Sequence, residues 1–297
     1  MLKDILLLVI ANACWGSGDV AAKLTFSQMS PEASAWIRYL LASAALMPIL
    51  WAQRSKIPRT IAGILPFIIL GACGFCINLI FNYQGLKLAP ASHGTTIRMC
   101  ESLFILLLSA VLLRERIGKK ALFGFAFGIA GLVLVLDIDF NNLSLFKSGY
   151  RLGDLLILTG VFVEAFNTAL GKRALEKSGP VFTVALSCLL GWLLLSLFYG
   201  PAVVMELAQK CPAPGALAAC VYLGLCSTAL AFSLYYLVLS RRDSYIVGMS
   251  LMIQPVIGIP LAAAVFNEPV TAGFLAGTVL ILAGVYITFG KKPAPTG

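Results

Sequence analysis

One apolar stretch of this 297-residue chain ends in Leu112-Leu113-Arg114-Glu115-Arg116-Ile117, and a similar stretch, 153 residues later, ends in Val265-Phe266-Asn267-Glu268-Pro269-Val270. At the same offset Gly124 is matched by Gly277, and Gly131 is matched by Gly284. A similarity that keeps a glutamate and two glycines in register indicates an internal duplication. The sequence therefore predicts a fold made of two similar halves.

The composition excludes most classes of soluble protein. Hydrophobic residues make up 60% of the chain and charged residues 12%, whereas soluble proteins are about half apolar and about a quarter charged. We therefore expect an integral membrane protein, and neither a cytosolic enzyme, a nucleic-acid-binding protein nor a disordered chain. The formal charge of +9 then reflects basic residues gathered in cytoplasmic loops.

Apolar stretches long enough to span a membrane recur along the whole chain. A membrane-spanning helix needs about 20 mainly apolar residues. Ten stretches approach this length: 4–23, 33–52, 61–85, 91–113, 119–137, 152–171, 181–204, 214–239, 245–266 and 271–290. Because they lack the alternation of a membrane β-barrel, we expect an all-α integral membrane protein with ten transmembrane helices.

Each half then contains five spans, an odd number, so the second half must enter the membrane from the opposite side. The basic residues agree with this inversion: of the 22 Lys and Arg, 15 fall on one side, five on the other and two within spans. The side richer in Lys and Arg is the cytoplasmic side. We therefore expect the N- and C-termini in the cytoplasm.

These assignments divide the chain into two repeats and two further segments. We expect a first repeat at 1–137, an external loop at 138–151, a second repeat at 152–290 and a cytoplasmic tail at 291–297. Inverted repeats in transporters place a binding site near the bilayer midplane, and this site opens alternately to either side. The duplication therefore predicts a secondary transporter in the cytoplasmic (inner) membrane.

Four short motifs support this interpretation. They are Trp15-Gly16-Ser17 followed by Lys23, the stretch Arg38-Tyr39-Leu40-Leu41-Ala42, Arg114-Glu115-Arg116, and Asn267-Glu268-Pro269 followed by Gly277 and Gly284. Together they resemble the drug/metabolite transporter superfamily, EamA type, over nearly the whole chain. The resemblance implies two inverted five-helix EamA repeats and the export or exchange of small metabolites, but it does not identify the metabolite.

Ionisable residues within the spans are candidate functional residues, because each costs roughly 2.5 to 3.5 kcal/mol at a helix centre. Five qualify: Asp19, Arg38, Arg98, Glu101 and Glu164. Arg98 and Glu101 share a helix face, so they form either a pair that lets the helix insert or the polar floor of a cavity. Glu101 aligns with Gln254 at the 153-residue offset, and Pro255 should interrupt that helix, which favours the cavity.

The remaining acids have two interpretations each. Asp19 either pairs with Lys23 or faces the cavity, where it would bind a substrate ammonium or carry a proton. Glu164 lies about three helical turns into its span, near the midplane, and a carboxylate there should bind and release protons near neutral pH. The alternative interpretation is structural: Glu164 is hydrogen-bonded by Asn167 and Thr168 or by groups on neighbouring helices. We predict Glu164 as the proton-coupling residue, with Asp19 as the second candidate.

Aromatic residues would line the same cavity, although most aromatic residues in membrane bundles pack or anchor at the interface. The predicted substrate-binding residues are Trp15, Asp19, Tyr83, Arg98, Glu101, Phe232, Tyr236 and Gln254. Tyr235 is a further aromatic candidate for the lining. Arg38 follows the family pattern near the external end of its span, so we interpret it as a structural or gating residue.

Neither a metal nor another cofactor is expected. All of the eight cysteines except Cys211 fall in or at the ends of apolar stretches, and we interpret them as small packing residues. Cys73 and Cys76 form a CxxC motif, but a metal site needs further Cys or His nearby, and His93 is the single histidine. No catalytic residue is predicted.

The expected function is transport of an amino acid or a related zwitterion by alternating access, because the cavity would hold both acidic and basic groups. An exporter of cationic drugs or amines driven by protons is the alternative, if Asp19 and Glu164 face the pore while Glu101 neutralises Arg98. A membrane-embedded enzyme is a remote alternative, since the chain has no Gly-x-Ser-x-Gly motif. Expected partners are a small-molecule substrate, the lipid bilayer and protons, without nucleic acid, and the chain should be a monomer or a weak dimer.

Overall fold

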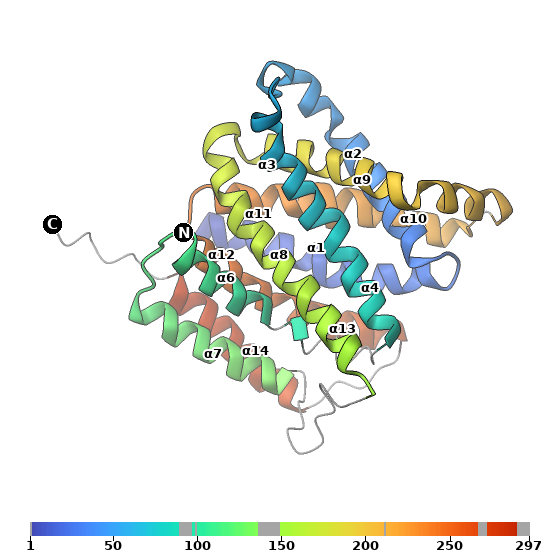
Figure 1. Ribbon diagram of the computed structural model, residues 1–297. Helices are drawn as coiled ribbons and strands as arrows, with labels where there is room; N and C mark the ends of the chain where they lie inside the picture. The colour runs from blue at the N-terminus through green and yellow to red at the C-terminus, as the bar shows by residue number, and fades with distance from the viewer. Residues whose placement is uncertain are drawn as a thin grey trace.

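The computed structural model contains only helices and their connections in the residues it describes (Figure 1). These residues are 2–88, 97–98, 100–135, 149–210, 212–266 and 272–289. Several features singled out in the sequence lie outside them: most of the predicted external loop, the predicted tail, the Asn267-Glu268-Pro269 motif, His93 and Cys211.

The helices of the first half follow the predicted apolar stretches. In order they are α1 (Leu2–Phe26), α2 (Pro31–Ala52), the 3-10 turn η1 (Arg54–Lys56), α3 (Ile61–Gly71), the π-helical η2 (Ala72–Ile77), α4 (Asn78–Leu88), α6 (Cys100–Val111) and α7 (Lys119–Val135). The elements α3, η2 and α4 follow one another without a gap, so they form one long helix with a π-helical segment in its middle.

The second half has a similar order of elements. They are α8 (Arg151–Ser178), α9 (Pro180–Gln209), α10 (Pro214–Tyr222), the π-helical η3 (Leu223–Leu230), α11 (Ala231–Leu239), α12 (Ser244–Met249), the 3-10 segment η4 (Ser250–Ile253), α13 (Gln254–Phe266) and α14 (Ala272–Thr288). Here α10, η3 and α11 form one continuous helix, as do α12, η4 and α13.

Local sequence explains where several helices begin. Ser30 Oγ accepts a hydrogen bond from the first turn of α2 at 3.1 Å, and Pro31 at the next position has no N–H that needs a partner. Thr60 caps α3 in the same way. Gly179 joins α8 to α9 with a φ of 86°, a left-handed conformation that glycine adopts without strain.

The helices are long and apolar enough for a membrane protein. Within the described residues, seven stretches qualify as spans: Leu2–Phe26, Pro31–Ala52, Ile61–Asn82, Arg151–Leu175, Pro180–Gln209, Pro214–Leu239 and Ser244–Val265. The described parts of α6, α7 and α14 are shorter, with 12, 17 and 17 residues. The predicted all-helical, multi-pass membrane protein is therefore confirmed, whereas the count of ten spans stays a prediction.

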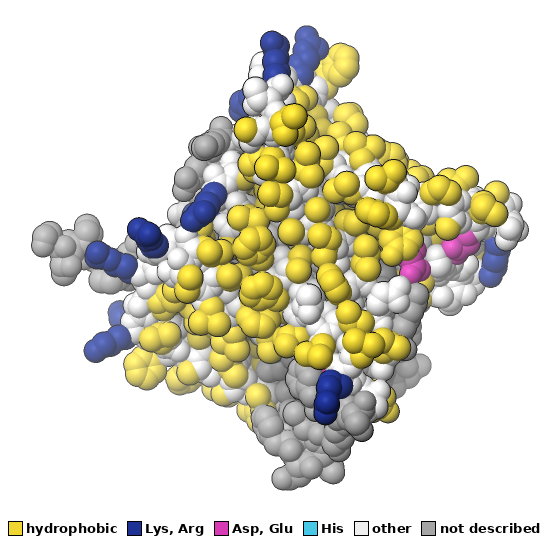
Figure 2. Space-filling model, in the orientation of Figure 1, with side chains coloured by type: hydrophobic (Ala, Val, Ile, Leu, Met, Phe, Trp, Pro, Cys, Tyr) yellow, Lys and Arg dark blue, Asp and Glu magenta, His cyan; other side chains and the backbone are white. Residues whose placement is uncertain are grey.

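The surface agrees with a lipid environment. Figure 2 shows hydrophobic side chains spread over a broad face, with Lys and Arg gathered mainly at its margins. Several large apolar side chains are mostly exposed, among them Trp51, Leu197 and Leu275. Soluble monomers rarely expose continuous apolar surface of this kind, so lipid chains are the medium that suits it.

Equivalent helices of the two halves pack against one another in opposite directions. Trp36 of α2 donates a hydrogen bond to Ser196 Oγ of α9 at 2.8 Å. Further along α2, Ser43 Oγ lies 3.5 Å from the Sγ atom of Cys188, which comes earlier in α9. Residue numbers therefore rise along α2 as they fall along α9, so the second helices of the two halves are antiparallel.

The glycines that indicated the duplication lie where α7 crosses α14. A Cβ on Gly131 would lie 2.6 Å from the carbonyl oxygen of Gly277, and a Cβ on Gly124 would lie 2.6 Å from the carbonyl oxygen of Gly284. Only residues without side chains allow such an approach, so these glycines let the two helices lie in close contact. These pairs also make α7 and α14 antiparallel.

Both halves contain a π-helical segment at an equivalent position. Adding the repeat offset of 153 to η2, 72–77, gives 225–230, which lies within η3, 223–230. Each segment touches the second helix of the other half: a Cβ on Gly191 of α9 would lie 2.6 Å from the Cβ atom of Phe75 in η2, and a Cβ on Gly224 of η3 would lie 2.9 Å from the carbonyl oxygen of Arg38. Single π-helical turns of this kind often occur at functional sites.

The first helix of each half, α1 or α8, also packs against the other half. Helix α1 packs against α11 and α13 of the second half, and α8 packs against α4 and α6 of the first half. This exchange brings helices of both halves together within the bundle (Figure 1). The candidate site is built there.

Candidate functional site

Trp15 of α1 lies edge-on against two rings of α11. The ring centroids are 5.1 Å apart for Trp15 and Phe232, and 5.2 Å apart for Trp15 and Tyr235. Edge-to-face pairs at these distances are favourable arrangements of aromatic rings. Tyr236 adjoins this group, 6.5 Å from Phe232. The structure therefore brings together three predicted binding residues, Trp15, Phe232 and Tyr236.

The group continues into the first half through the π-helical segment η2. Phe75 lies 5.1 Å from Phe232 and 5.3 Å from Tyr39 of α2, measured between ring centroids. Phe75 and Tyr39 are functional candidates that the sequence analysis did not select, since aromatic residues are common in every span. We call Trp15, Tyr39, Phe75, Phe232, Tyr235 and Tyr236 the aromatic cluster.

Two carboxylates from different halves lie beside the aromatic cluster. Glu101 of α6 and Glu164 of α8 are close enough to interact electrostatically with one another, and Arg98 interacts with Glu101 in the same way. Tyr235 is within electrostatic range of both carboxylates, and Tyr236 is within range of Glu164. Two acids that the sequence presented as separate candidates thus belong to one site.

The charged residues of the site differ in exposure. Glu101 and Glu164 are half-buried, whereas the Arg98 side chain is exposed. Asp19 is part of α1 and Tyr83 is part of α4, but their side chains lie outside what the structure describes. The site as described therefore combines two partly buried carboxylates with one exposed cation.

Two buried polar atoms near the carboxylates have no hydrogen-bond partner among the described residues. They are Asn167 Oδ1 and the Tyr235 hydroxyl, which lies near Thr168 without a hydrogen bond of standard geometry. The amide nitrogen of Asn167 donates to the Tyr236 hydroxyl at 3.4 Å, and a Cβ on Gly74 of η2 would touch the same amide. Because buried polar groups without partners are costly, both atoms are candidates for a hydrogen bond to a bound solute.

Gln254 lies beside α1, at the point where the ninth predicted span is interrupted. Its Nε2 atom donates to Asn12 Oδ1 at 3.3 Å, and Asn12 Nδ2 donates to Ser250 Oγ at 3.1 Å. Pro255 has no backbone N–H to donate to the preceding turn, and the 3-10 segment η4 ends immediately before Gln254. Asn12 is a fully buried residue that the sequence analysis did not select, and its only signal was an amide inside an apolar stretch.

Arg38 is held by the π-helical segment η3. Its Nε atom donates to Thr228 Oγ1 at 2.6 Å, and a terminal nitrogen donates to the carbonyl oxygen of Ser227 at 3.4 Å. These bonds join α2 of the first half to η3 of the second half. They favour the structural interpretation of Arg38 over a role beside Glu101 and Glu164.

Ligands for a metal do not assemble in the described part of the chain. Within it, no group of three or more His, Cys, Asp or Glu is placed to hold an ion. The described cysteines are free, and both residues of the CxxC motif, Cys73 and Cys76, lie in η2. The site therefore offers aromatic rings, carboxylates and single hydrogen-bonding groups.

Polar contacts join the two halves at the end of the bundle where α1 begins. Arg242, after α11, forms an ion pair with Asp4 of α1 at 2.7 Å. Glu115, after α6, accepts hydrogen bonds from the backbone N–H of Ser244 at 2.8 Å and of Tyr245 at 3.4 Å. Burial raises the pKa of the Glu115 carboxyl, although the bond from Ser244 opposes the shift. In this structure the halves are thus bonded together at this end.

Comparisons with known proteins agree with this architecture. The EamA-like transporter family matches residues 2–137 and 151–290. A relative from Salmonella typhimurium, named as a probable amino-acid metabolite efflux pump, is 27% identical over 98% of this chain and 96% of its own length. An Escherichia coli protein of the same name is 24% identical over the same shares.

Two further similarities extend over nearly the full length. An uncharacterized transporter from Archaeoglobus fulgidus is 25% identical over 98% of this chain and all of its own length. A protein of known crystal structure, 21% identical over 97% of both chains, has the same fold with a TM-score of 0.81. Since the family matches both halves, this chain belongs to the EamA-like transporter family and is a multi-pass membrane transporter.

Proposed function

We propose that this protein is a secondary transporter that moves a small organic metabolite, an amino acid or a related zwitterion, across the cytoplasmic membrane by alternating access, as an exporter or an exchanger. The observation that carries the proposal is the aromatic cluster beside Glu101 and Glu164, because it draws side chains from both halves of a duplicated membrane protein. The names of the two bacterial relatives support an amino-acid metabolite as the substrate class.

The proposed architecture has ten transmembrane helices in two inverted five-helix repeats, at 1–137 and 152–290. An external loop at 138–151 joins them, the tail at 291–297 and both termini are cytoplasmic, and the chain is a monomer or a weak dimer. The antiparallel packing of α2 with α9 and of α7 with α14 supports the inversion. A site between inverted repeats opens to one side at a time when one repeat rocks against the other.

Substrate recognition would divide between charge and aromatic contact. In our proposal Arg98 binds the carboxylate of a zwitterion, and Glu101 binds its ammonium group. Trp15, Phe232 and Tyr236 would cover the apolar part of the solute, and aromatic faces also attract cations. The proximity of Arg98 to Glu101 supports the recognition of opposite charges at a short separation. Asp19, Tyr83 and Gln254 complete the proposed binding set.

Proton coupling would use Glu164, with Asp19 as the second candidate. Two carboxylates in a poorly solvated site hold a proton between them, because both cannot ionise cheaply. The electrostatic contact between Glu101 and Glu164 supports this arrangement. A substrate ammonium that binds Glu101 would favour release of the shared proton, so substrate and proton would compete for the site. Such competition is what a carrier needs in order to exchange substrate for a proton.

A second candidate function is the proton-coupled export of cationic drugs or amines. The two half-buried carboxylates beside aromatic rings favour it, because this combination binds ammonium groups, whereas Arg98 is exposed. The two functions differ in one requirement: a zwitterion needs Arg98, and an amine does not. Arg98→Gln should therefore abolish transport of an amino acid and spare transport of an amine.

Exchange by purified protein in proteoliposomes tests the proposal. Vesicles loaded with unlabelled amino acids or amines should take up labelled solute faster than empty vesicles, since a carrier returns more quickly when loaded. Trp15→Ala should reduce the exchange about tenfold or more, whereas Trp51→Ala, a lipid-facing tryptophan that is 71% exposed, should not. No solute exchanging faster than in protein-free vesicles would contradict the proposal, and exchange of amines alone would favour the second candidate.

A further inference from the structure

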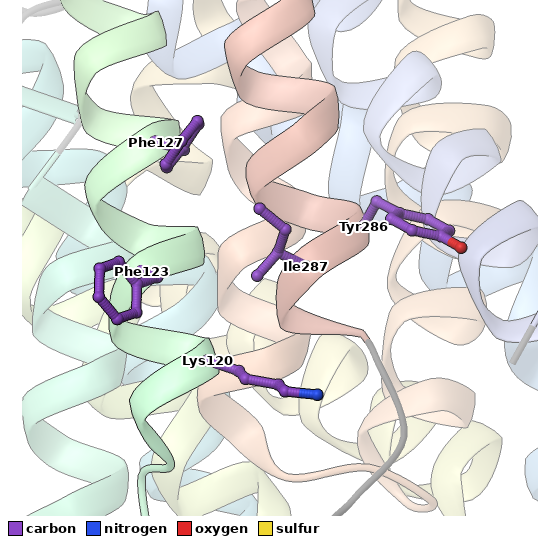
Figure 3. A pocket seen from close by; sticks show the side chains of 5 residues that line it. All are labelled: Lys120, Phe123, Phe127, Tyr286 and Ile287. Atoms are coloured by element: carbon purple, nitrogen blue, oxygen red, sulfur yellow. The ribbon is translucent and has the colours of Figure 1, made fainter.

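A shallow apolar groove of about 470 Å³ lies on the outer surface between α7 and α14, near the start of α7. Its lining consists of Lys120, Phe123 and Phe127 from α7 and of Tyr286 and Ile287 from α14. Figure 3 shows Phe127 and Ile287 on the facing sides of the two helices, with Lys120 extending beneath Ile287. The groove thus has aromatic side chains from both helices, an aliphatic side chain from α14 and a cation at one end.

The packing of α7 on α14 explains why the groove exists. The helices touch through Gly124 and Gly284, so their backbones are close and the large side chains stand on either side of the contact. Lys120, Phe123 and Phe127 recur at helical spacing on one face of α7, and Phe123 is 65% exposed. The groove therefore faces the surrounding membrane rather than the candidate transport site.

The charge at this end of the groove is positive. Four cations on and just before α7 are exposed: Arg114, Arg116, Lys119 and Lys120. The one acid of this segment, Glu115, is turned to the N–H groups of Ser244 and Tyr245, and α14 contains no charged residue between Ala272 and Thr288. An anion is therefore the ligand that complements the mouth of the groove.

We propose that this groove is a binding site for one anionic phospholipid, with the phosphate of its headgroup beside Lys120 and an acyl chain along Phe123, Phe127 and Ile287. Phe127 lies about 10 Å deeper than Lys120 along the helix, so the groove accommodates the upper part of a chain. Basic pockets at the cytoplasmic side of membrane helices bind anionic headgroups. The leaflet follows from the proposed orientation of the helices, but the lipid contacts do not depend on transport.

Lipid retention by the purified full-length protein tests this site. The delipidated protein is titrated with dioleoyl-phosphatidylglycerol or dioleoyl-phosphatidylcholine, and native mass spectrometry counts the lipids that remain bound and the copies of the chain. We expect one phosphatidylglycerol retained in preference to phosphatidylcholine. Lys120→Gln should weaken its binding about fivefold, as removal of one surface charge predicts, and Lys120→Arg should retain it. Lys56→Gln, another exposed lysine, is the matched control and should change nothing.

Three results would overturn the site. The first is equal retention of both lipids by the wild-type protein, and the second is equal retention of phosphatidylglycerol by Lys120→Gln and the wild type. The third is a lipid-free dimer, which would mean that a second copy of the chain covers the groove. Because the measurement requires no transported solute, failure of the lipid site and failure of the proposed transport function are distinguishable.

Discussion

At the scale of single residues, the site depends on the meeting of Glu101 and Glu164 beside Tyr235 and Tyr236. Each carboxylate comes from a different half of the chain, so no local pattern in the sequence relates them. The repeat offset pairs Glu101 with Gln254, but in the structure Gln254 donates a hydrogen bond to Asn12 of α1. The polar chemistry of the two halves is thus unequal, although their helices are equivalent.

Glu164→Gln should separate exchange from proton coupling. The amide keeps the shape of the side chain but neither binds nor releases a proton, so exchange at equal pH should persist while accumulation driven by a pH gradient is lost. Uptake of labelled solute into proteoliposomes, with and without a pH gradient, measures both. Glu206→Gln, which alters a carboxylate bonded to Ser30 outside the aromatic cluster, should keep both activities. Accumulation by Glu164→Gln under a pH gradient alone would transfer the coupling role to Asp19.

Tyr235→Phe should weaken solute binding without weakening the fold. Its buried hydroxyl has no hydrogen bond of standard geometry among the described residues, although Thr168 lies near it, so its removal costs the fold little. A lost hydrogen bond to the solute should raise its Kd about three- to tenfold, while the unfolding temperature stays equal or rises. Titration calorimetry and thermal unfolding with the exchanged solute test this, and the exposed Tyr150→Phe is the control. An unchanged Kd would remove Tyr235 from the binding set.

At the scale of helices, the contact between α7 and α14 should tolerate no side chain at its centre. Gly131→Ala would bring a Cβ within 2.6 Å of the carbonyl oxygen of Gly277, and overpacking of this kind costs about 1–3 kcal/mol. Gly118→Ala, where a Cβ would meet nothing within 4 Å, is the matched control. Thermal unfolding in detergent should place Gly131→Ala below the wild type and Gly118→Ala level with it or above it. Equal unfolding temperatures for all three would show that the crossing carries little stability.

The link between α6 and α12 should make stability depend on pH. Burial raises the pKa of Glu115, so the folded protein holds this proton more tightly than the unfolded chain. The contribution is therefore present below the usual carboxyl pKa and is lost as pH rises through the raised value. We expect the unfolding temperature of the wild type to fall relative to Glu115→Gln as pH rises from 4 to 7, measured by differential scanning fluorimetry with a thiol dye. Parallel curves would mean that Glu115 does not titrate in this window.

Much of the helical framework was predictable, because span length and glycine register are properties of the sequence itself. The π-helical segments were not, since a single widened turn leaves no distinct signal in an apolar stretch, and η2 positions Phe75 against Phe232. The rings of Trp15, Phe232 and Tyr236 lie together in the structure, and their role in binding stays a prediction. The proximity of Glu101 to Glu164 was not foreseen, because it depends on how α6 packs against α8.

At the scale of the whole molecule, the proposed transport mechanism depends on the opposite orientation of the two halves. A pair of equivalent helices that run antiparallel, such as α2 and α9, is what insertion in opposite orientations requires. The contacts at the end where α1 begins, including the ion pair between Asp4 and Arg242, join both halves there. Opening the site toward that end would require these contacts to separate.

The most direct test is to label the segments that follow two equivalent helices. Ser55→Cys follows α2 and Gln209→Cys ends α9, both at exposed positions, in a background whose native cysteines are replaced or shown to be silent. Intact cells and inverted membrane vesicles are treated with an impermeant maleimide. Inverted insertion of the two halves predicts that residue 209 reacts in intact cells and residue 55 reacts only in inverted vesicles. Labelling of both positions from the same side would contradict the opposite insertion of the two halves.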